Sequence, residues 1–146
     1  MEDSGNLSLD GDAVRYRSKF GDWELPVSSL RVLGENTNQN GPYADDWFLC
    51  FATGPEMWLE APVSAEGSGE LLKALSKRLG VSLATELFSS TDFTSRVLWP
   101  PELAGQPMFQ FANAPAESWF AKLLGTHRVN QTYSEPVKLY LVANQA

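Results

Sequence analysis

Residues 47–52 read Trp-Phe-Leu-Cys-Phe-Ala, an apolar run without a charged residue. A strand that faces water on one side alternates apolar and polar residues, whereas a short unbroken apolar run is typical of a strand buried on both faces. Gly54-Pro55 then supplies a turn signal, and residues 57–61 predict the next strand. We therefore predict that residues 47–52 form a central strand of a meandering antiparallel sheet, covered on both sides.

The sequence before this run predicts a hairpin. Residues 14–20 alternate strictly, and three basic residues share one face, namely Arg15, Arg17 and Lys19. A period of two over this length is typical of a half-buried strand. Gly21-Asp22 predicts a two-residue turn, after which residues 23–25 resume the alternation. Pro26 lacks an amide hydrogen, so this stretch is predicted to be an edge strand or to carry a bulge.

The sequence changes from apolar to polar between the hairpin and the central strand. Residues 30–34 predict either a continuation of the hairpin strand or a new strand. Residues 35–42 read Glu-Asn-Thr-Asn-Gln-Asn-Gly-Pro, in which Asn-Gly and Gly-Pro are strong turn signals. We therefore predict a loop over residues 35–42.

A helix is predicted over residues 68–80. Ser68 is a suitable N-cap, and Glu70 lies in the first turn, where the helix dipole favours a negative charge. Gly80 is the residue type expected just after a helix end. The predicted apolar stripe consists of Leu71, Leu72, Leu75 and Leu79.

The second half of the chain predicts shorter elements. Residues 97–99 form a predicted strand that two prolines stop, and residues 108–112 form another. Residues 115–124 predict a second helix, because proline is tolerated in a first turn and an apolar stripe follows it. Residues 137–143 alternate, which predicts a last strand.

Length and composition favour one domain. The chain has 146 residues, of which 43% are hydrophobic, and a domain of this size can bury a substantial core. Residues 1–12 are polar and predict a flexible N-terminal tail or a first edge segment. Residues 13–146 are predicted to form one globular domain, in which 13–80 form the sheet with its helix and 81–146 an extension that the sequence does not place.

The order of these elements resembles the small bacterial members of the pleckstrin-homology-like (PH-like) superfold. The resemblance rests on the hairpin over 16–25, the strands over 47–52 and 57–61, and the helix over 71–79. It implies an α+β fold in which a helix plugs a curved antiparallel sheet or partly open β-barrel. It also implies binding of phosphoinositides, peptides or proteins without catalysis. Phosphoinositide binding does not carry over, because the basic residues alternate along a strand and do not surround the hairpin turn.

Charge excludes some classes of partner. The net charge is −7, from 18 acidic and 11 basic residues. Nucleic acids and anionic membranes attract proteins through cations, so we expect neither as a partner. No apolar run approaches the ~18 residues of a membrane span, and the N-terminus lacks the basic and apolar regions of a signal peptide. We therefore expect a cytoplasmic protein.

No pattern predicts catalysis, a cofactor or a metal site. Cys50 and His127 could pair as nucleophile and base, but Cys50 lies in the apolar run, where burial makes a thiol inert. Asp45 and Asp46 are adjacent, so a strand would point them to opposite faces. The oxygen-rich residues 36–46 lack the spacing of an EF-hand, and a zinc site fails on the number of Cys and His ligands.

Aromatic residues indicate binding instead. Tyr43 lies in the polar loop and Trp99 precedes two prolines, so we expect both to be partly exposed. Exposed aromatic residues beside Asn and Asp suit a protein-binding surface. The predicted partner-binding residues are Asn38, Asn40, Tyr43, Asp45, Asp46 and Trp99.

The leading hypothesis is a non-catalytic module that binds a protein or peptide. One alternative is an acidic partner that neutralises or regulates a basic protein, because an acidic surface steers a basic partner. The other is a small hydrolase with an unrecognised site. The oligomeric state stays open.

Overall fold

The computed structural model describes residues 5–19, 21–37, 47–85, 94–113 and 129–144. In chain order, its elements are β1 (Asn6–Asp10), β2 (Ala13–Ser18), β3 (Gly21–Pro26), the short 3-10 helix η1 (Val27–Ser29), β4 (Val32–Thr37), β5 (Trp47–Gly54), β6 (Met57–Pro62), α1 (Ser68–Leu79), β7 (Thr94–Trp99), β8 (Phe109–Asn113), β9 (Val129–Tyr133) and α3 (Glu135–Ala143).

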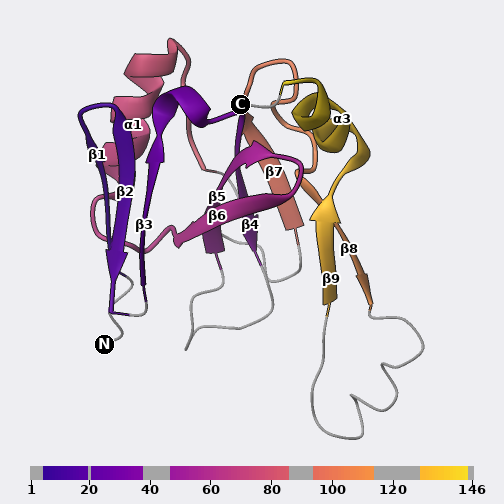
Figure 1. The fold of residues 1–146 in the computed structure, drawn as a ribbon, viewed down its shortest axis with the longest axis horizontal. Helices are drawn as coiled ribbons and strands as arrows, with labels where there is room; N and C mark the ends of the chain where they lie inside the picture. Colours follow the sequence, from indigo (N-terminus) through magenta and orange to yellow (C-terminus); the bar gives the residue numbers. More distant parts are fainter. Residues whose placement is uncertain (1–4, 20, 38–46, 86–93, 114–128, 145–146) are drawn as a thin grey trace, which may run out of the picture.

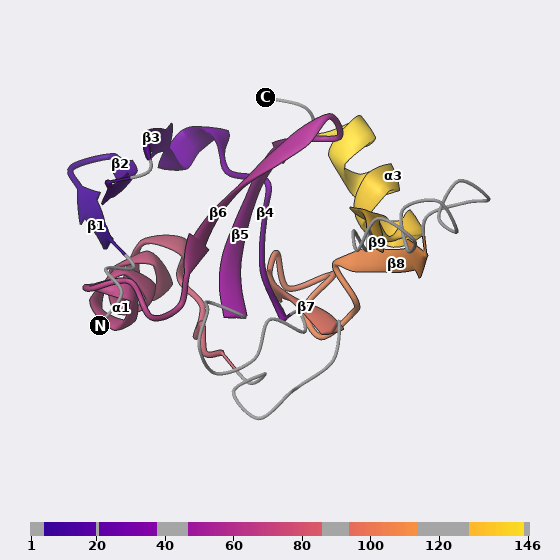
Figure 2. The ribbon, with the colours of Figure 1, turned by 90° about the horizontal axis from the view of Figure 1, so that it is seen from below.

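The strands form three antiparallel sheets, with the orders β1-β2-β3, β6-β5-β4-β7 and β8-β9. Figures 1 and 2 show the four-stranded sheet in the middle, with β1, β2, β3 and α1 on one side and β8, β9 and α3 on the other. The predicted α+β class with antiparallel sheets is therefore confirmed. The sheets are not closed into a barrel.

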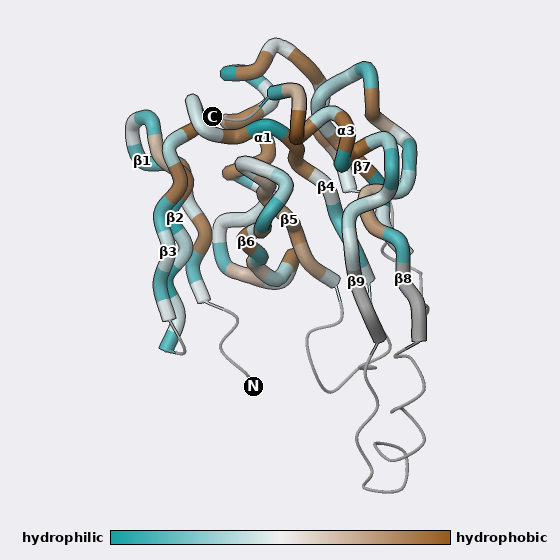
Figure 3. The backbone as a smooth tube through the Cα atoms, turned by 45° about the vertical axis from the view of Figure 1, so that its right-hand side comes forward, coloured by the Kyte–Doolittle hydropathy of each residue, from teal (hydrophilic) through white to brown (hydrophobic). Residues whose placement is uncertain are grey.

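β5 is the predicted central strand, and both of its faces are covered. Leu49 and Phe51 belong to the core cluster on the side of β1–β3 and α1. Cys50 and Ala52 belong to the cluster on the side of β8, β9 and α3. All four side chains are fully buried, which explains why the sequence of β5 is apolar at successive positions. Figure 3 shows hydrophobic stretches in β5 and hydrophilic stretches along β2 and β3 at the side.

β2 and β3 form the predicted hairpin, and β3 lies at the edge of its sheet, where Pro26 is tolerated. The predicted turn at Gly21-Asp22 is wrong, because Gly21 pairs with Ser18 and Asp22 with Arg17. Side chains extend the ladder to this point: Oδ1 of Asp22 accepts the backbone amide of Ser18 at 3.1 Å. The Ser18 hydroxyl donates to the Gly21 carbonyl at 2.9 Å.

The N-terminal strand and α1 are joined side by side. Residues 6–10 form β1, the edge segment that was one of the two expectations for this stretch, and the Leu7 amide donates to the Glu66 carbonyl. α1 begins at Ser68 and ends at Leu79 as predicted, but its N-cap is Gly67. Gly67 has a φ of 87°, and a Cβ there would collide with the Leu7 carbonyl oxygen, so only glycine fits.

β4 corrects the loop prediction. It is a new strand after η1, and the predicted loop over 35–42 is wrong at its start, because Glu35, Asn36 and Thr37 continue β4 and are buried. Residues 38–42 lie outside the described residues. Polar residues can end this strand because β4 lies between β5 and β7, and their side chains find partners inside the protein.

In the C-terminal part of the chain, the structure confirms two predicted strands and contradicts a third. β7 and β8 confirm the strands predicted over 97–99 and 108–112. The helix predicted over 115–124 lies outside the described residues. The strand predicted over 137–143 is wrong, because these residues belong to α3.

The sequence before and at the start of α3 contains signals for the beginning of a helix, which the alternating pattern conceals. Ser134 is its N-cap in an extended conformation, and Pro136 lies in the first turn, a position that proline favours. Val137 and Leu141, four residues apart, are fully buried, whereas Leu139 between them is 61% exposed. The buried side chains therefore follow a helical period and not a period of two.

Alanine substitutions distinguish the helix from a strand. Leu141→Ala is expected to lower the free energy of unfolding by about 2–5 kcal/mol, because it removes a buried side chain. Leu139→Ala is expected to change it by no more than about 0.5 kcal/mol, because that side chain faces water. Urea unfolding followed by tryptophan fluorescence measures both; equal losses would favour a strand with both leucines on one face.

Candidate functional site

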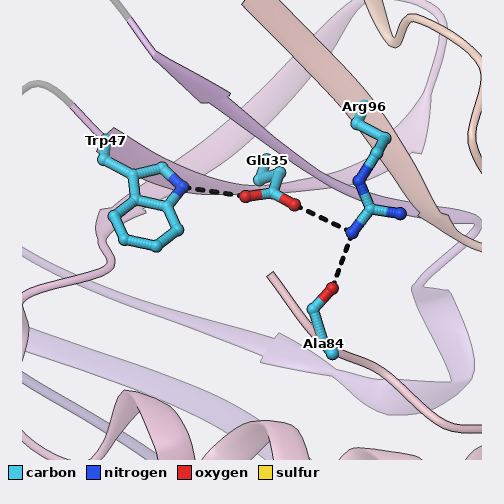
Figure 4. Close-up of polar contacts among 4 residues, drawn as sticks. All are labelled: Glu35, Trp47, Ala84 and Arg96. Carbon is cyan, nitrogen blue, oxygen red and sulfur yellow. Dashed lines mark hydrogen bonds and ion pairs between the residues drawn. The ribbon is translucent and has the colours of Figure 1, made fainter. Parts of the chain in front are cut away.

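A buried carboxylate, Glu35, joins three parts of the chain. Its side chain is 0% exposed. Oε1 accepts a hydrogen bond from Nε1 of Trp47 at 2.8 Å, and Oε2 accepts one from Nη2 of Arg96 at 3.0 Å (Figure 4). The same nitrogen of Arg96 donates to the carbonyl oxygen of Ala84 at 2.6 Å.

The strand register places these side chains. Glu35 on β4 stands opposite Leu49 on β5 and directly opposite Arg96 on β7. A buried carboxylate is costly unless it is paired with a cation and hydrogen-bonded, and here it is both. The Arg96 side chain is 20% exposed, so the pair reaches the surface on one side.

The Glu35 network lies where chain segments enter and leave the four-stranded sheet. Thr37, the last residue of β4, pairs with Trp47 at the start of β5 and with Thr94 at the start of β7. Residues that flank segments 38–46 and 86–93 therefore lie together at one end of strands β4, β5 and β7. Connections supported on a rigid sheet are common positions for binding residues.

Cys50 lies on the face of the sheet opposite to Glu35, and its surroundings make the thiol unreactive. Its thiol donates to Oδ1 of Asn36 at 2.7 Å. Burial raises the pKa of Cys50 well above its usual value, and the negative charges of Glu60 and Glu35 raise it further. A thiol without access to solvent that stays protonated is a poor nucleophile, which agrees with the burial predicted for this residue.

The polar groups of Tyr133 and of its neighbour Trp58 also have hydrogen-bond partners inside the protein. The Tyr133 hydroxyl donates to the Met57 carbonyl at 2.6 Å. Burial and, to a smaller extent, Cys50 raise the pKa of Tyr133 above its usual value. The ring packs against Trp58 and Phe109 with centroid distances of 5.2 and 5.5 Å. Nε1 of Trp58 donates to Oε1 of Glu60 at 2.6 Å. These contacts hold β6, β8 and β9 together.

The described part of the chain contains no group of three or more His, Cys, Asp or Glu side chains that could hold a metal ion. No helix in that part is long and apolar enough to cross a membrane.

Most of the predicted site residues lie outside the described residues. These are Asn38, Asn40, Tyr43, Asp45 and Asp46, together with His127. Trp99 is described: it is half-buried, stands opposite Leu33 on β4 and packs against the core on the side of α1. The structure therefore gives Trp99 a packing role.

The polar residues that begin at Glu35 predict a loop, so the sequence does not predict the Glu35 network. A signal was present in two places. Residues 35–37 and 94–96 are polar ends of strands whose remaining residues are apolar. Antiparallel neighbours bring such ends together, and an acid in one with a base in the other, Glu35 and Arg96, is the pattern of a cross-strand ion pair.

Exposed apolar side chains occur on α3 and at the start of β6. Among the described residues, the exposed large hydrophobic side chains are Met57, Leu139 and Val142, at 51%, 61% and 51%. Met57 begins β6, and the turn between β5 and β6 lies beside α3 (Figures 1 and 2).

Comparison with protein-family models, with curated proteins and with solved structures finds no match to this chain.

Removing the charge of Glu35 is expected to destabilise the protein. Glu35→Gln leaves Arg96 without its anion, and the cost is expected near about 3 kcal/mol, the lower end for a broken buried ion pair, because Arg96 is partly hydrated. Glu24→Gln makes the same chemical change in an exposed ion pair and is expected to cost no more than about 0.5 kcal/mol. Urea unfolding of both variants measures the difference.

A double-mutant cycle shows whether the two charges act together. The loss for Glu35→Gln combined with Arg96→Met is expected to be smaller than the sum of the two single losses, because each single variant leaves one charge unpaired. Additive losses would show that the pair contributes no coupling.

The thiol of Cys50 is expected to react slowly in the folded protein. Its raised pKa keeps it protonated at neutral pH, and burial excludes the reagent. Labelling with iodoacetamide at pH 7.5 is expected to be slow in buffer and rapid in denaturing urea. Labelling in buffer at the rate of a free thiol would contradict the burial of this residue.

Proposed function

We propose that this chain is a non-catalytic binding module that recognises a protein or peptide partner through residues 38–46. The single observation that carries the proposal is the Glu35 network, which fixes both described ends of that segment to the central sheet. Thr37 and Trp47 are paired neighbours, and the Trp47 indole is bonded to Glu35. A segment held at closely spaced ends loses less freedom on binding, which favours affinity.

The composition of the segment supports recognition of a protein. It contains Asn38, Asn40, Tyr43, Asp45 and Asp46. An aromatic side chain among amides and carboxylates supplies both apolar contact and hydrogen bonding, as binding surfaces commonly do. The proposal includes a PH-like relationship for the fold and a cytoplasmic location.

Two described groups that could supply chemistry, the Cys50 thiol and the Tyr133 hydroxyl, support binding over catalysis. The thiol of Cys50 is buried and bonded to Asn36, and the Tyr133 hydroxyl is bonded to a backbone carbonyl. A nucleophile needs an adjacent base and access to a substrate. Neither group has solvent access of the kind that a substrate requires.

The second candidate is an acidic partner of a basic protein, and the net charge of −7 favours it. Attraction between oppositely charged surfaces speeds association and weakens as salt is added. A partner held mainly by apolar and hydrogen-bonded contacts is less sensitive to salt. Salt dependence therefore separates the two candidates.

The testing experiment is affinity capture from a lysate of the source organism, followed by identification of the captured protein and titration of it. Tyr43→Ala with Asp45→Ala is expected to weaken binding of the captured protein by about tenfold or more, equivalent to about 1.4 kcal/mol or more. The matched control is Lys73→Ala, an exposed change on α1, which is expected to leave affinity unchanged. Isothermal titration at low and high salt gives both affinities.

Two results would overturn the assignment. Unchanged affinity in the Tyr43→Ala, Asp45→Ala variant would exclude the 38–46 segment. Loss of binding in Leu139→Ser with Val142→Ser, with the segment variant unaffected, would place the contact on the exposed apolar residues of α3 instead.

A further inference from the structure

The outer face of the β1-β2-β3 sheet carries charges in a regular arrangement. Val14 and Leu25 on its inner face are buried in the core. On the outer face, Arg15 of β2 stands directly opposite Glu24 of β3, and Arg17 stands directly opposite Asp22. Each base on one strand therefore has an acid at the same level on the next strand.

A cleft of about 250 Å³ opens on this part of the sheet. It is lined by Arg15, Tyr16, Arg17, Asp22, Trp23 and Glu24. The charged residues on its rim are exposed or partly exposed, so side chains of another molecule can enter between them.

The two arginines of the cleft differ in their contacts. Arg15 is held by Asp10 at 2.7 Å and by Glu24 at 3.4 Å. Arg17 forms no ion pair within the described part of the chain, and Oδ1 of Asp22 opposite it accepts the Ser18 amide. Arg17 and Asp22 are therefore available to charges on another molecule.

We propose that this outer face binds a second copy of the chain, face to face, about a two-fold axis that runs parallel to β2 and β3 and between them. Such an axis exchanges the positions of the two strands across the interface. Arg17 then faces Asp22 of the second copy, and Asp22 faces its Arg17. The same rotation brings Arg15 to Glu24 of the second copy, so the surface is complementary to itself.

The alternative arrangement is repulsive. A two-fold axis in the plane of the interface but perpendicular to the strands places β2 over β2, so that arginines face arginines. Like charges at short distance cost free energy. The strand register therefore selects one geometry for the pair.

The strength of this association follows from its chemistry. Exposed ion pairs contribute only about 0–1 kcal/mol each. The dimer is therefore weak and salt-sensitive, and it forms at high protein concentration or low ionic strength. This inference is independent of the function proposed for residues 38–46.

Sedimentation equilibrium of the full chain tests the proposal. At about 10 mM salt, where the Debye length is about 30 Å, the average mass is expected to rise with concentration toward twice the monomer mass. At about 1 M salt, where that length is about 3 Å, the monomer is expected. An average mass that stays equal to the monomer mass at low salt and high protein concentration overturns the proposal.

Charge reversal then tests the geometry. Arg17→Glu and Asp22→Arg are each expected to weaken association by about tenfold or more, because each places like charges in contact. An equimolar mixture of the two variants is expected to restore it, since the carboxylate introduced in one variant then faces the guanidinium introduced in the other. Lys73→Glu on α1 changes the net charge by the same two units as Arg17→Glu but lies outside the charged face. It is therefore expected to weaken association less than Arg17→Glu does.

A further variant separates the charge of Asp22 from its hydrogen bond to the Ser18 amide. Asp22→Asn keeps an oxygen that can accept the Ser18 amide but loses the charge, so it is also expected to weaken association at low salt, by less than Asp22→Arg does. Circular dichroism confirms that each variant is folded. Association that survives Arg17→Glu, or a mixture that fails to restore the dimer, overturns the proposed interface.

Discussion

The buried carboxylate of Glu35 is the interaction on which the rest of the structure depends. β4 and β5 are the two inner strands of the four-stranded sheet, and packing on both of their faces removes water from every side chain near their middle. A charge in that position persists only with a cation and hydrogen-bond donors beside it. Arg96 from β7 and Trp47 from β5 supply them, and Arg96 also fixes the backbone at Ala84. One side chain therefore ties together the parts of the chain that flank two connecting segments.

The Cys50 thiol and the Tyr133 hydroxyl, on the other side of the sheet, are bonded within the protein. Cys50 is bonded to Asn36, and Tyr133 to the Met57 carbonyl. Both groups have a raised pKa mainly because they are buried. The features that reach solvent are of a different kind: apolar side chains on α3 and β6, and an ordered set of charges on β2 and β3.

Sequence patterns predicted those parts of the fold in which one local signal dominates. The apolar run over 47–52 gave a two-sided central strand, and α1 followed its stripe of leucines with Gly80 at its end. Patterns failed where a long-range contact decides the outcome. Glu35 looked like the start of a loop because its partner Arg96 lies 61 residues away. Residues 137–143 alternate like a strand, yet packing on Val137 and Leu141 with a helix start at Ser134 makes them α3. The predicted partner-binding residues of 38–46 have no local pattern that fixes their partner.

Hydrogen exchange of the Trp47 indole, measured by NMR, tests the central claim most directly. Its N–H is bonded to a carboxylate that is fully buried, so exchange is expected to be slow in the wild-type protein, close to the rate set by unfolding of the sheet. In Glu35→Gln that protection is expected to fall sharply while core amides of β5 keep theirs to the extent that the variant stays folded. Exchange of the wild-type indole at the rate of a solvent-exposed tryptophan would show that Glu35 does not hold the end of the sheet.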